Sequence, residues 1–327
     1  MTDGRSTPTV HEMFPIFIGA CPRSGTTFLG DRLGALLKGR VTPESQFKRR
    51  TLEALAKGDV DGAIAYLDAS PMYRLWTRRP GREALRACTT ASAFFTRLVF
   101  PDGLDPDEAP YWIDHTPVNL DDFAVLHEAF PNARFISLVR DGRAVFSSVR
   151  GLEWGPTTPL QTAPWWAART APGLGASLTY PHLCKTVRYE DLVSGDPEVW
   201  TDLVRFVTGD PTRSVSAQAL ATQSGFDVPD FTRHQHALVG SAPSAARAEA
   251  WRRDLAPREI ELFEANAGAL LDTLGYTRDY RFPRFATRGE MIRMGEWPVR
   301  ITAQVMTRIR LARRWRKVKD PAKGAPT

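Results

Sequence analysis

The segment IFIGACPRSGTT, residues 16–27, contains groups that bind an oxyanion. Arg23 offers a guanidinium, Ser24 offers a hydroxyl, and Gly25 allows a tight turn in which successive backbone N–H groups point the same way. An apolar run typical of a buried strand precedes the turn, and Leu29 and Leu33 begin one apolar face of a helix after it. The helix dipole adds partial positive charge at such a turn, so the segment predicts a phosphate or sulfate site.

The loop lacks the lysine of nucleoside triphosphatases. Their pattern, GxxxxGK[ST], requires lysine directly after the second glycine, whereas this chain has Thr26 and then Thr27. Its cation is Arg23, two residues before Gly25. A planar guanidinium suits phosphate or sulfate oxygens, and a lysine beside a magnesium-binding serine suits a γ-phosphoryl group. A purely structural turn is the alternative interpretation.

The stretch PRSGTTFL resembles the 5′-phosphosulfate loop of the P-loop sulfotransferases, which use 3′-phosphoadenosine 5′-phosphosulfate (PAPS) as sulfuryl donor. The resemblance runs from about Phe14 to Tyr276 and includes VRYEDLVSGDPEVW and AWRRDLAPREIELFEANAGALLDTLGY. It is closest to the branch of protein-tyrosine and glycan sulfotransferases. It implies PAPS as co-substrate without a metal, with five loop residues on the phosphosulfate: Arg23, Ser24, Gly25, Thr26 and Thr27.

The family's second nucleotide motif is a strand that ends in arginine, with a serine eight residues later. In RFISLVRDGRAVFSSV these residues are Arg140 and Ser148. Two turns of helix after the Asp141–Gly142 turn would return Ser148 toward the strand end. The resemblance implies that both side chains contact the 3′-phosphate of PAPS. A surface arginine followed by an unrelated helical serine is the alternative.

Sulfuryl transfer also needs a base for the acceptor proton and positive charge at the departing oxygen. Arg23 suits the second task. Glu44, in TPESQF, matches the glutamate that serves as base in the protein-tyrosine and glycan branch, although a plain helix N-terminal glutamate fits the same position. His115, in WIDHTPVNL, stands where the family often has lysine; a cationic role, a role as base and a structural role all stay open. Asn119 can cap or orient.

The segment VGSAPSAAR occupies the place where family members have a loop that closes on the nucleotide. The resemblance implies that Arg247 supplies its cation, although Arg252 and Arg253 lie close by.

Strand and helix patterns alternate along the chain. Strands are expected at 14–20, YWIDHTP, RFISLV and KTVRYE, with helices after the loop, around NLDDFAVLHEAF, at 197–207 and at 257–274. This alternation predicts an α/β fold of the three-layer P-loop type, a parallel sheet flanked by helices. Ligands of such sheets bind beyond the carboxyl ends of the strands.

The domain organisation follows from the same patterns. We expect a disordered N-terminus at 1–12, a sulfotransferase domain at 13–285, and a basic amphipathic tail at 286–327. Residues 48–100 lack strand patterns and predict a helical insertion over the sheet, the usual place for a lid or acceptor pocket.

Composition narrows the class of protein. The 327 residues, 43% of them hydrophobic, can bury one large core. No apolar run of membrane-spanning length and no signal-peptide pattern occur, so a cytoplasmic location is expected. Three scattered cysteines, Cys21, Cys88 and Cys184, indicate reduced thiols, and the six histidines show no metal-binding spacing.

The net charge of +6 belongs to one segment. Residues 297–319 carry eight basic side chains and no acidic one, and the rest of the chain is slightly acidic, which argues against a nucleic-acid partner. Ile301, Val305, Ile309 and Trp315 recur with helical spacing. The segment therefore predicts peripheral contact with an anionic membrane at its inner face; a terminal helix docked on the body is the alternative.

Two other functions stay open. An ATP-dependent small-molecule kinase is disfavoured by Thr26 and by a strand that ends in Arg140 where a magnesium-binding aspartate is needed. A non-catalytic nucleotide-binding or membrane-associated protein is disfavoured by Glu44. The acceptor, a small molecule or glycan, is not identified, and neither is the oligomeric state. Aromatic side chains that can stack on a carbohydrate or hold a lipid, or fill the core, are Tyr66, Tyr73, Trp76, Phe94, Phe95, Trp112, Trp154, Trp165 and Trp166.

Overall fold

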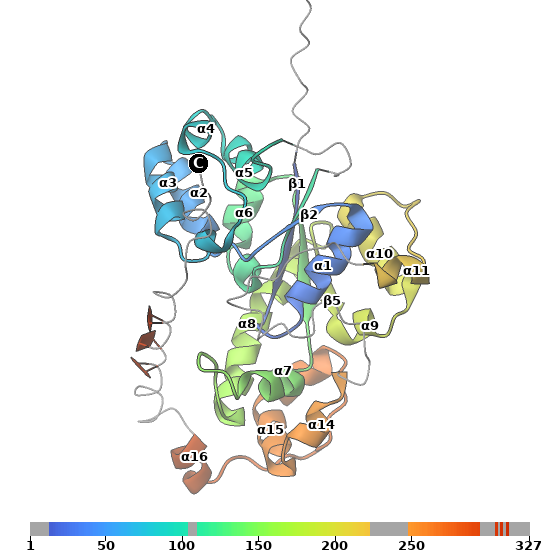
Figure 1. The fold of residues 1–327 in the computed structure, drawn as a ribbon. Coiled ribbons are helices and arrows are strands. Elements are labelled where there is room, and N and C mark those ends of the chain that lie inside the picture. The colour runs from blue at the N-terminus through green and yellow to red at the C-terminus, as the bar shows by residue number, and fades with distance from the viewer. Residues whose placement is uncertain are drawn as a thin grey trace, which may run out of the picture.

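The computed structural model describes residues 13–103, 110–222 and 248–294, and positions 305, 306, 308, 309, 312 and 313. Within these residues a five-stranded parallel sheet lies at the centre of the fold (Figure 1). Its strand order is β2-β3-β1-β4-β5. The strands are β1 Phe14–Ala20, β2 Arg40–Thr42, β3 Tyr111–Asp114, β4 Arg134–Val139 and β5 Cys184–Arg188. The parallel sheet and four of its strands agree with the sequence analysis, whereas β2 was not predicted.

The central strands are buried on both faces. Along β1, Phe17 packs into one hydrophobic cluster, and Ile16 and Ile18 pack into the cluster on the opposite face. Strand β4 repeats the alternation with Phe135 and Ile136. Burial on both faces explains why these strands are continuous apolar runs.

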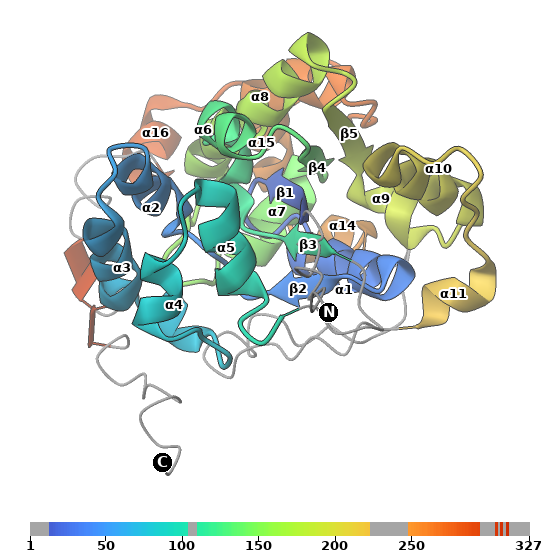
Figure 2. The ribbon, with the colours of Figure 1, turned by 90° about the horizontal axis from the view of Figure 1, so that it is seen from above.

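Helices cover both faces of the sheet, which makes the three layers (Figure 2). One face carries α1 Thr26–Leu37 and α10 Pro197–Thr208. The opposite face carries α6 Phe123–Ala129, part of α8 Pro159–Thr179, and the insertion. A third cluster, with α7 Gly142–Val149, α14 Trp251–Asp254 and α15 Pro257–Thr273, lies beyond the carboxyl ends of the strands (Figure 1). The smaller elements are η2 Pro117–Leu120, α9 Tyr189–Val193, α11 Ala217–Ala221 and α16 Arg288–Met294.

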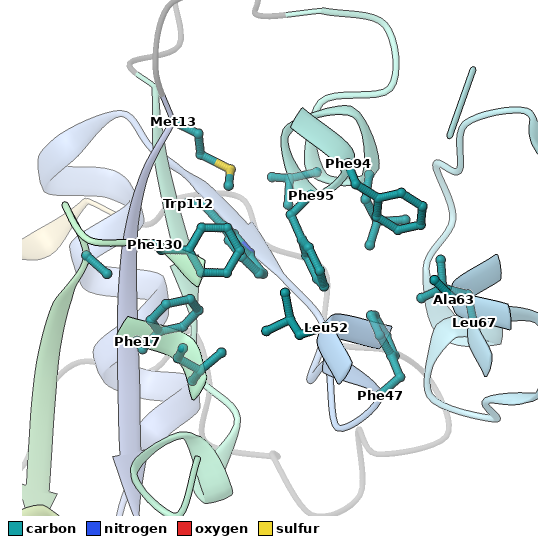
Figure 3. Close-up of a cluster of buried hydrophobic side chains, with 14 of the residues drawn as sticks. Met13, Phe17, Phe47, Leu52, Ala63, Leu67, Phe94, Phe95, Trp112 and Phe130 are labelled. Atoms are coloured by element: carbon teal, nitrogen blue, oxygen red, sulfur yellow. The ribbon is translucent and has the colours of Figure 1, made fainter. Parts of the chain in front are cut away.

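The insertion at 48–100 is helical, as expected. Its elements are α2 Lys48–Leu55, α3 Val60–Ala69, η1 Tyr73–Leu75, α4 Arg82–Arg86 and α5 Ala91–Val99. Figure 3 shows Phe47, Leu52 and Phe95 facing Phe17, Trp112 and Phe130 of the sheet side. Six of the aromatic residues considered for acceptor contacts are buried in the hydrophobic clusters: Tyr73, Trp76, Phe94, Phe95, Trp112 and Trp166. The first five hold the insertion on the sheet, and Trp166 of α8 packs in the third cluster, so none of the six is free to stack on an acceptor.

The three cysteines agree with the expectation of reduced thiols. Cys21, Cys88 and Cys184 are free thiols, and the first and last are buried. No group of three or more His, Cys, Asp or Glu side chains in the described parts of the chain is arranged to hold a metal ion. No helix among those same residues has the length and apolarity needed to cross a bilayer.

The basic tail lies largely outside the described residues. Of residues 297–319 only six positions are described, and they are helical. Arg247 also lies outside the described residues, so its expected contact with the nucleotide stays a prediction.

Candidate active site

The turn after β1 has the backbone shape of an anion-binding loop. Arg23 has φ 76° and Gly25 has φ 101°, both in the left-handed region. Glycine is required at position 25 for two reasons. Its φ is left-handed, and a Cβ there would lie 2.6 Å from the ring of Tyr189. Helix α1 begins at the next residue, so its first N–H groups point out of the sheet edge.

Hydroxyl groups line this turn. Ser24, Thr26 and Thr27 are buried, and Ser24 Oγ has no hydrogen-bond partner among the described residues. A buried hydroxyl without a partner is uncommon in folded proteins. Together with the α1 N-terminus, it fits an oxyanion that accepts hydrogen bonds at this position.

The second predicted motif meets the first at the carboxyl edge of the sheet. Arg140 follows β4, and its Nη1 donates a 2.9 Å hydrogen bond to the carbonyl oxygen of Arg23. Helix α7 brings Ser148 back to the same place, where its Oγ accepts a 3.1 Å hydrogen bond from Arg23 Nε. The Arg140 guanidinium lies 4.5 Å from the centre of the Tyr189 ring, and its Nε is buried without a described partner. Two donors that can bind a phosphate therefore stand beside the loop.

A buried ion-pair cluster holds the turn between Arg140 and α7. The Arg143 guanidinium is buried between Asp141, at 2.7 Å, and Glu264 of α15, at 2.5 Å. It also lies 4.0 Å from the centre of the Trp251 ring. Asp141 Oδ1 caps α7 by accepting a 2.8 Å hydrogen bond from the Arg143 N–H. This cluster determines where Arg140 and the start of α7 lie.

Glu44 follows β2 at the same edge and is partly buried. Burial raises the pKa of its carboxyl group to about 7. A hydrogen bond from Gln46, 3.1 Å long, lowers the pKa, as do the charges of Lys48 and Arg23, whereas the Asp114 carboxylate raises it. A carboxyl group that titrates near neutral pH, within the electrostatic influence of Arg23, has the properties of a general base.

His115 is buried at the end of β3 and packs against α1. A Cβ at Gly30 of that helix would lie 3.2 Å from the Cβ of His115. Burial lowers the pKa of its imidazole to about 4, despite the nearby Asp114 carboxylate. His115 is therefore neutral at physiological pH, which argues against the cationic role considered from the sequence.

Asn119 links the ends of two strands. Its Nδ2 donates 3.0 Å hydrogen bonds to the carbonyl oxygens of Ile18 in β1 and Asp114 in β3. These contacts orient the strand ends, the second of the two roles left open for this residue.

Sequence analysis missed two parts of this edge. Tyr189, the first residue after β5, packs between Gly25 and Arg140, and its position at a strand end was the signal that could have found it. Lys48 and Asp114 form a buried ion pair of 2.6 Å near Glu44. Lys48 begins a KRR run that is typical of a solvated helix face, so only packing reveals this pair.

A polar cavity of about 290 Å³ adjoins the ends of β4 and β5. Arg188 lies over the ring of Tyr276 at 4.5 Å, and Tyr276 donates a 2.9 Å hydrogen bond to Glu190. Glu190 also accepts a 3.0 Å hydrogen bond from the Asp141 N–H. The cavity is thus a continuation of the Arg140 region.

Comparison with known proteins adds independent information. A model of the sulfotransferase family matches residues 15–209. Protein-tyrosine sulfotransferase 1 of Danio rerio is 28% identical over 222 residues, covering 62% of this chain and 56% of that protein. The human protein-tyrosine sulfotransferase 1 is 29% identical over 150 residues, covering 42% of this chain and 35% of that protein. The chain thus spans about half the length of the Danio relative, and less of the human one.

Solved structures show the same fold. The sulfotransferase domain from the Synechococcus PCC 7002 olefin synthase superposes with a TM-score of 0.52 at 22% identity, covering 83% of this chain and 98% of that domain. At this identity the likeness concerns the fold alone. Because the family model matches more than half of its length, the chain belongs to the sulfotransferase family.

Proposed function

We propose that this chain transfers a sulfuryl group from PAPS to a hydroxyl or amine of an acceptor. The observation that carries the proposal is the meeting of the loop at 21–27 with Arg140 and Ser148 at one sheet edge, beside Glu44. The loop offers donors for one anionic group, and Arg140 with Ser148 offers donors for a second. Glu44 adds a base.

The donors fit a nucleotide that carries an anion at each end. The loop hydroxyls and the α1 N-terminus suit the 5′-phosphosulfate, and the unpartnered Ser24 Oγ supports this assignment. Arg140 and Ser148 suit the 3′-phosphate. The unpartnered Nε of Arg140 supports this second assignment. When bound, PAPS supplies the activated sulfuryl group.

Glu44 removes the acceptor proton in this proposal. The acceptor oxygen or nitrogen forms a bond to sulfur, the bond from sulfur to the bridging phosphate oxygen breaks, and the acceptor proton passes to the Glu44 carboxylate. Arg23 donates hydrogen bonds to the negative charge that develops on the departing oxygen. Proton removal by a placed carboxylate accounts for about 10²–10⁴-fold in rate. The neutral, buried His115 is the weaker candidate for base.

The kinase alternative is disfavoured by the surroundings of Asp141. This residue is the carboxylate closest in sequence to the end of β4, the position where a kinase would need a magnesium ligand. Both of its oxygens already accept hydrogen bonds from Arg143. The non-catalytic alternative is disfavoured by Glu44, whose pKa of about 7 a binding protein does not need.

The acceptor stays a proposal at the level of chemical class. We propose a small molecule or glycan hydroxyl, such as that of a carbohydrate or glycolipid. Its support is the basic C-terminal segment, because most aromatic side chains of the insertion are packed in the core. Protein-tyrosine sulfotransferases are the named relatives, so a peptide acceptor belongs in the same screen.

Peripheral contact with an anionic membrane is the proposed role of residues 297–319, in a protein of cytoplasmic location. The described segment just before them supports this role. Phe282 and Phe285 are 83% and 74% exposed. Arg288 and Arg293 stand on α16, a helix with no buried residue, so the segment offers both apolar and cationic groups to a lipid surface.

Vesicle flotation tests the membrane contact. We expect the full chain to float with vesicles of phosphatidylcholine and phosphatidylglycerol and not with phosphatidylcholine alone. The double variant Phe282→Ser, Phe285→Ser is expected to float less, whereas Leu178→Ser, a change at a similarly exposed residue on α8, is the matched control. Equal flotation of the parent with both vesicle types would reject the contact.

Two measurements test the enzyme. Calorimetry should show that adenosine 3′,5′-bisphosphate (PAP) binds at least about 10-fold more tightly than adenosine 5′-phosphate, because Arg140 and Ser148 contact only the former. Transfer of labelled sulfate from PAPS to a cell extract and to candidate glycans and peptides then identifies the acceptor class. Equal affinity for the two nucleotides would overturn the assignment.

A further inference from the structure

A buried ion pair lies close enough to the proposed base, Glu44, to act on its charge. Lys48 Nζ of α2 and Asp114 Oδ2 of β3 are 2.6 Å apart, and their side chains are 3% and 0% exposed. Removing two charges from water costs several kcal/mol per ion, so a buried pair often contributes no net stability. The contacts of this pair with its neighbours indicate a role other than stability.

The pair converges on Ser45, the residue that follows Glu44. Lys48 Nζ donates a 2.6 Å hydrogen bond to Ser45 Oγ, and Ser45 Oγ donates to Asp114. The Ser45 N–H donates a 2.8 Å hydrogen bond to Thr116 Oγ1. Ser45 is fully buried, so the peptide that joins it to Glu44 is held at the N–H and through the side chain.

Asp114 is itself held in place from the β3 side. Its Oδ1 accepts hydrogen bonds from the Thr116 N–H, at 2.9 Å, and from Thr116 Oγ1, at 2.5 Å. Asn119 Nδ2 lies 3.2 Å from the same oxygen. The carboxylate therefore has a single orientation, and it transmits that orientation to Ser45.

We propose that the buried Lys48–Asp114 pair positions Glu44 through Ser45 and tunes its ionisation through two opposed charges. This inference rests on the proposed role of Glu44 as the base. Lys48 and Asp114 are positioning residues, because they reach Glu44 through Ser45 and hydrogen-bond within the buried network around it. The pair thereby holds the base at a defined place after β2.

The two charges of the pair act on the pKa of Glu44 in opposite directions. The charged groups that act on Glu44 are Asp114 from β3, Lys48 from α2 and Arg23 from the loop. The negative charge of Asp114 raises the pKa of Glu44, and the positive charges of Lys48 and Arg23 lower it. Removing one member of the pair must therefore shift this pKa in the opposite direction from removing the other.

The test is a carboxyl NMR titration of the full chain labelled with ¹³C at glutamate Cδ, with the Glu44 signal identified by its loss in Glu44→Gln. We expect Lys48→Met to raise the pKa of Glu44 and Asp114→Asn to lower it. The matched control is Arg49→Ala, which breaks the exposed pairs of the neighbouring arginine with Glu53 and Asp122 and should leave the titration unchanged. A Glu44 pKa that stays unchanged in both variants, or shifts the same way in both, would overturn the proposal.

Ser45→Ala provides a variant that keeps both charges and so does not leave one unpaired. Sulfate release from PAPS with water as acceptor should fall at least about 10-fold, because the base is no longer held. The KM for PAPS should stay within about threefold, since the nucleotide contacts are separate from Ser45. An unchanged rate in a folded Ser45→Ala variant would refute the positioning role.

The two proposals fail in different ways. A parent chain that does not prefer PAP over adenosine 5′-phosphate refutes the proposed function. The NMR titration does not depend on nucleotide binding, and it tests the effect of the pair on Glu44 in either case.

Discussion

Arg23 Nε donates a 3.1 Å hydrogen bond to Ser148 Oγ, although the two residues are 125 positions apart in the sequence. Each belongs to a different motif, one after β1 and the other on α7. Helix α7 follows strand β4. Because β4 pairs with β1 in parallel, both motifs lie at the same edge of the sheet. The contact joins the loop and α7 at this edge.

Ser148→Ala is expected to weaken the binding of PAP selectively. A hydrogen bond from a hydroxyl to a charged phosphate contributes about 1.5–3 kcal/mol, so the affinity for PAP should fall at least about 10-fold. Affinity for adenosine 5′-phosphate, which lacks the 3′-phosphate, should not change. Calorimetry with both nucleotides makes the comparison. A loss of equal size for both would mean that Ser148 acts through Arg23 and the loop.

Glu44→Gln is expected to abolish turnover and to spare nucleotide binding. The amide cannot accept the acceptor proton, so the rate of sulfate transfer should fall by about 10²–10⁴-fold. The affinity for PAP should be nearly that of the parent. Glu53→Gln, a change at an exposed glutamate on α2, serves as the control. If Glu44→Gln retains a rate within about threefold of the parent, the role of base moves to His115.

The pH dependence distinguishes the two candidate bases. A base acts when deprotonated, so the rate should rise with pH through the pKa of the group in use. Glu44, with a pKa of about 7, predicts a rise between about pH 6 and pH 8. His115, whose pKa is lowered to about 4, predicts a rate already constant over that range. The measurement is the rate of sulfate release from PAPS across this range.

Gly25→Ala is expected to disrupt the loop. The added methyl group meets two obstacles, a φ of 101° and the ring of Tyr189 at 2.6 Å. Strain of about 1–3 kcal/mol from the backbone alone lowers PAP affinity by about 5-fold or more. Gly58→Ala is a matched control, because Gly58 has φ 73° but open space around it. Equal PAP affinity in both variants and the parent would show that the turn tolerates the change.

Glu264→Gln is expected to destabilise the fold. It leaves the buried Arg143 with one carboxylate partner, Asp141, and breaking a buried pair costs about 3–5 kcal/mol. Urea unfolding should show this loss in the free energy of unfolding. Asp61→Asn, which breaks the exposed pair with Arg86, should cost less than about 1 kcal/mol. A loss for Glu264→Gln as small as that for Asp61→Asn would contradict the structural role of Arg143.

Much of the fold was determined by short stretches of sequence. The strands at Phe14–Ala20 and Arg134–Val139 were predicted with their observed bounds, because a strand buried on both faces is a continuous apolar run. The anion-binding loop was equally local, since its groups are consecutive. The long helix Pro159–Thr179 was not predicted: it contains Pro164 and Pro172, which normally disfavour a helix. Its packing against α15 and the sheet outweighs that local preference.

The sequence by itself determined the family resemblance, the two anion-binding motifs and the choice of Glu44 and His115 as candidate bases. Only the tertiary structure decided how those groups ionise and what holds them. Burial raises the pKa of Glu44 and lowers the pKa of His115. The packing of α2 on the sheet brings Lys48 against Asp114. These effects depend on how much water and charge surround each side chain. That environment is made by residues far apart along the chain, so spacing within a motif cannot reveal it.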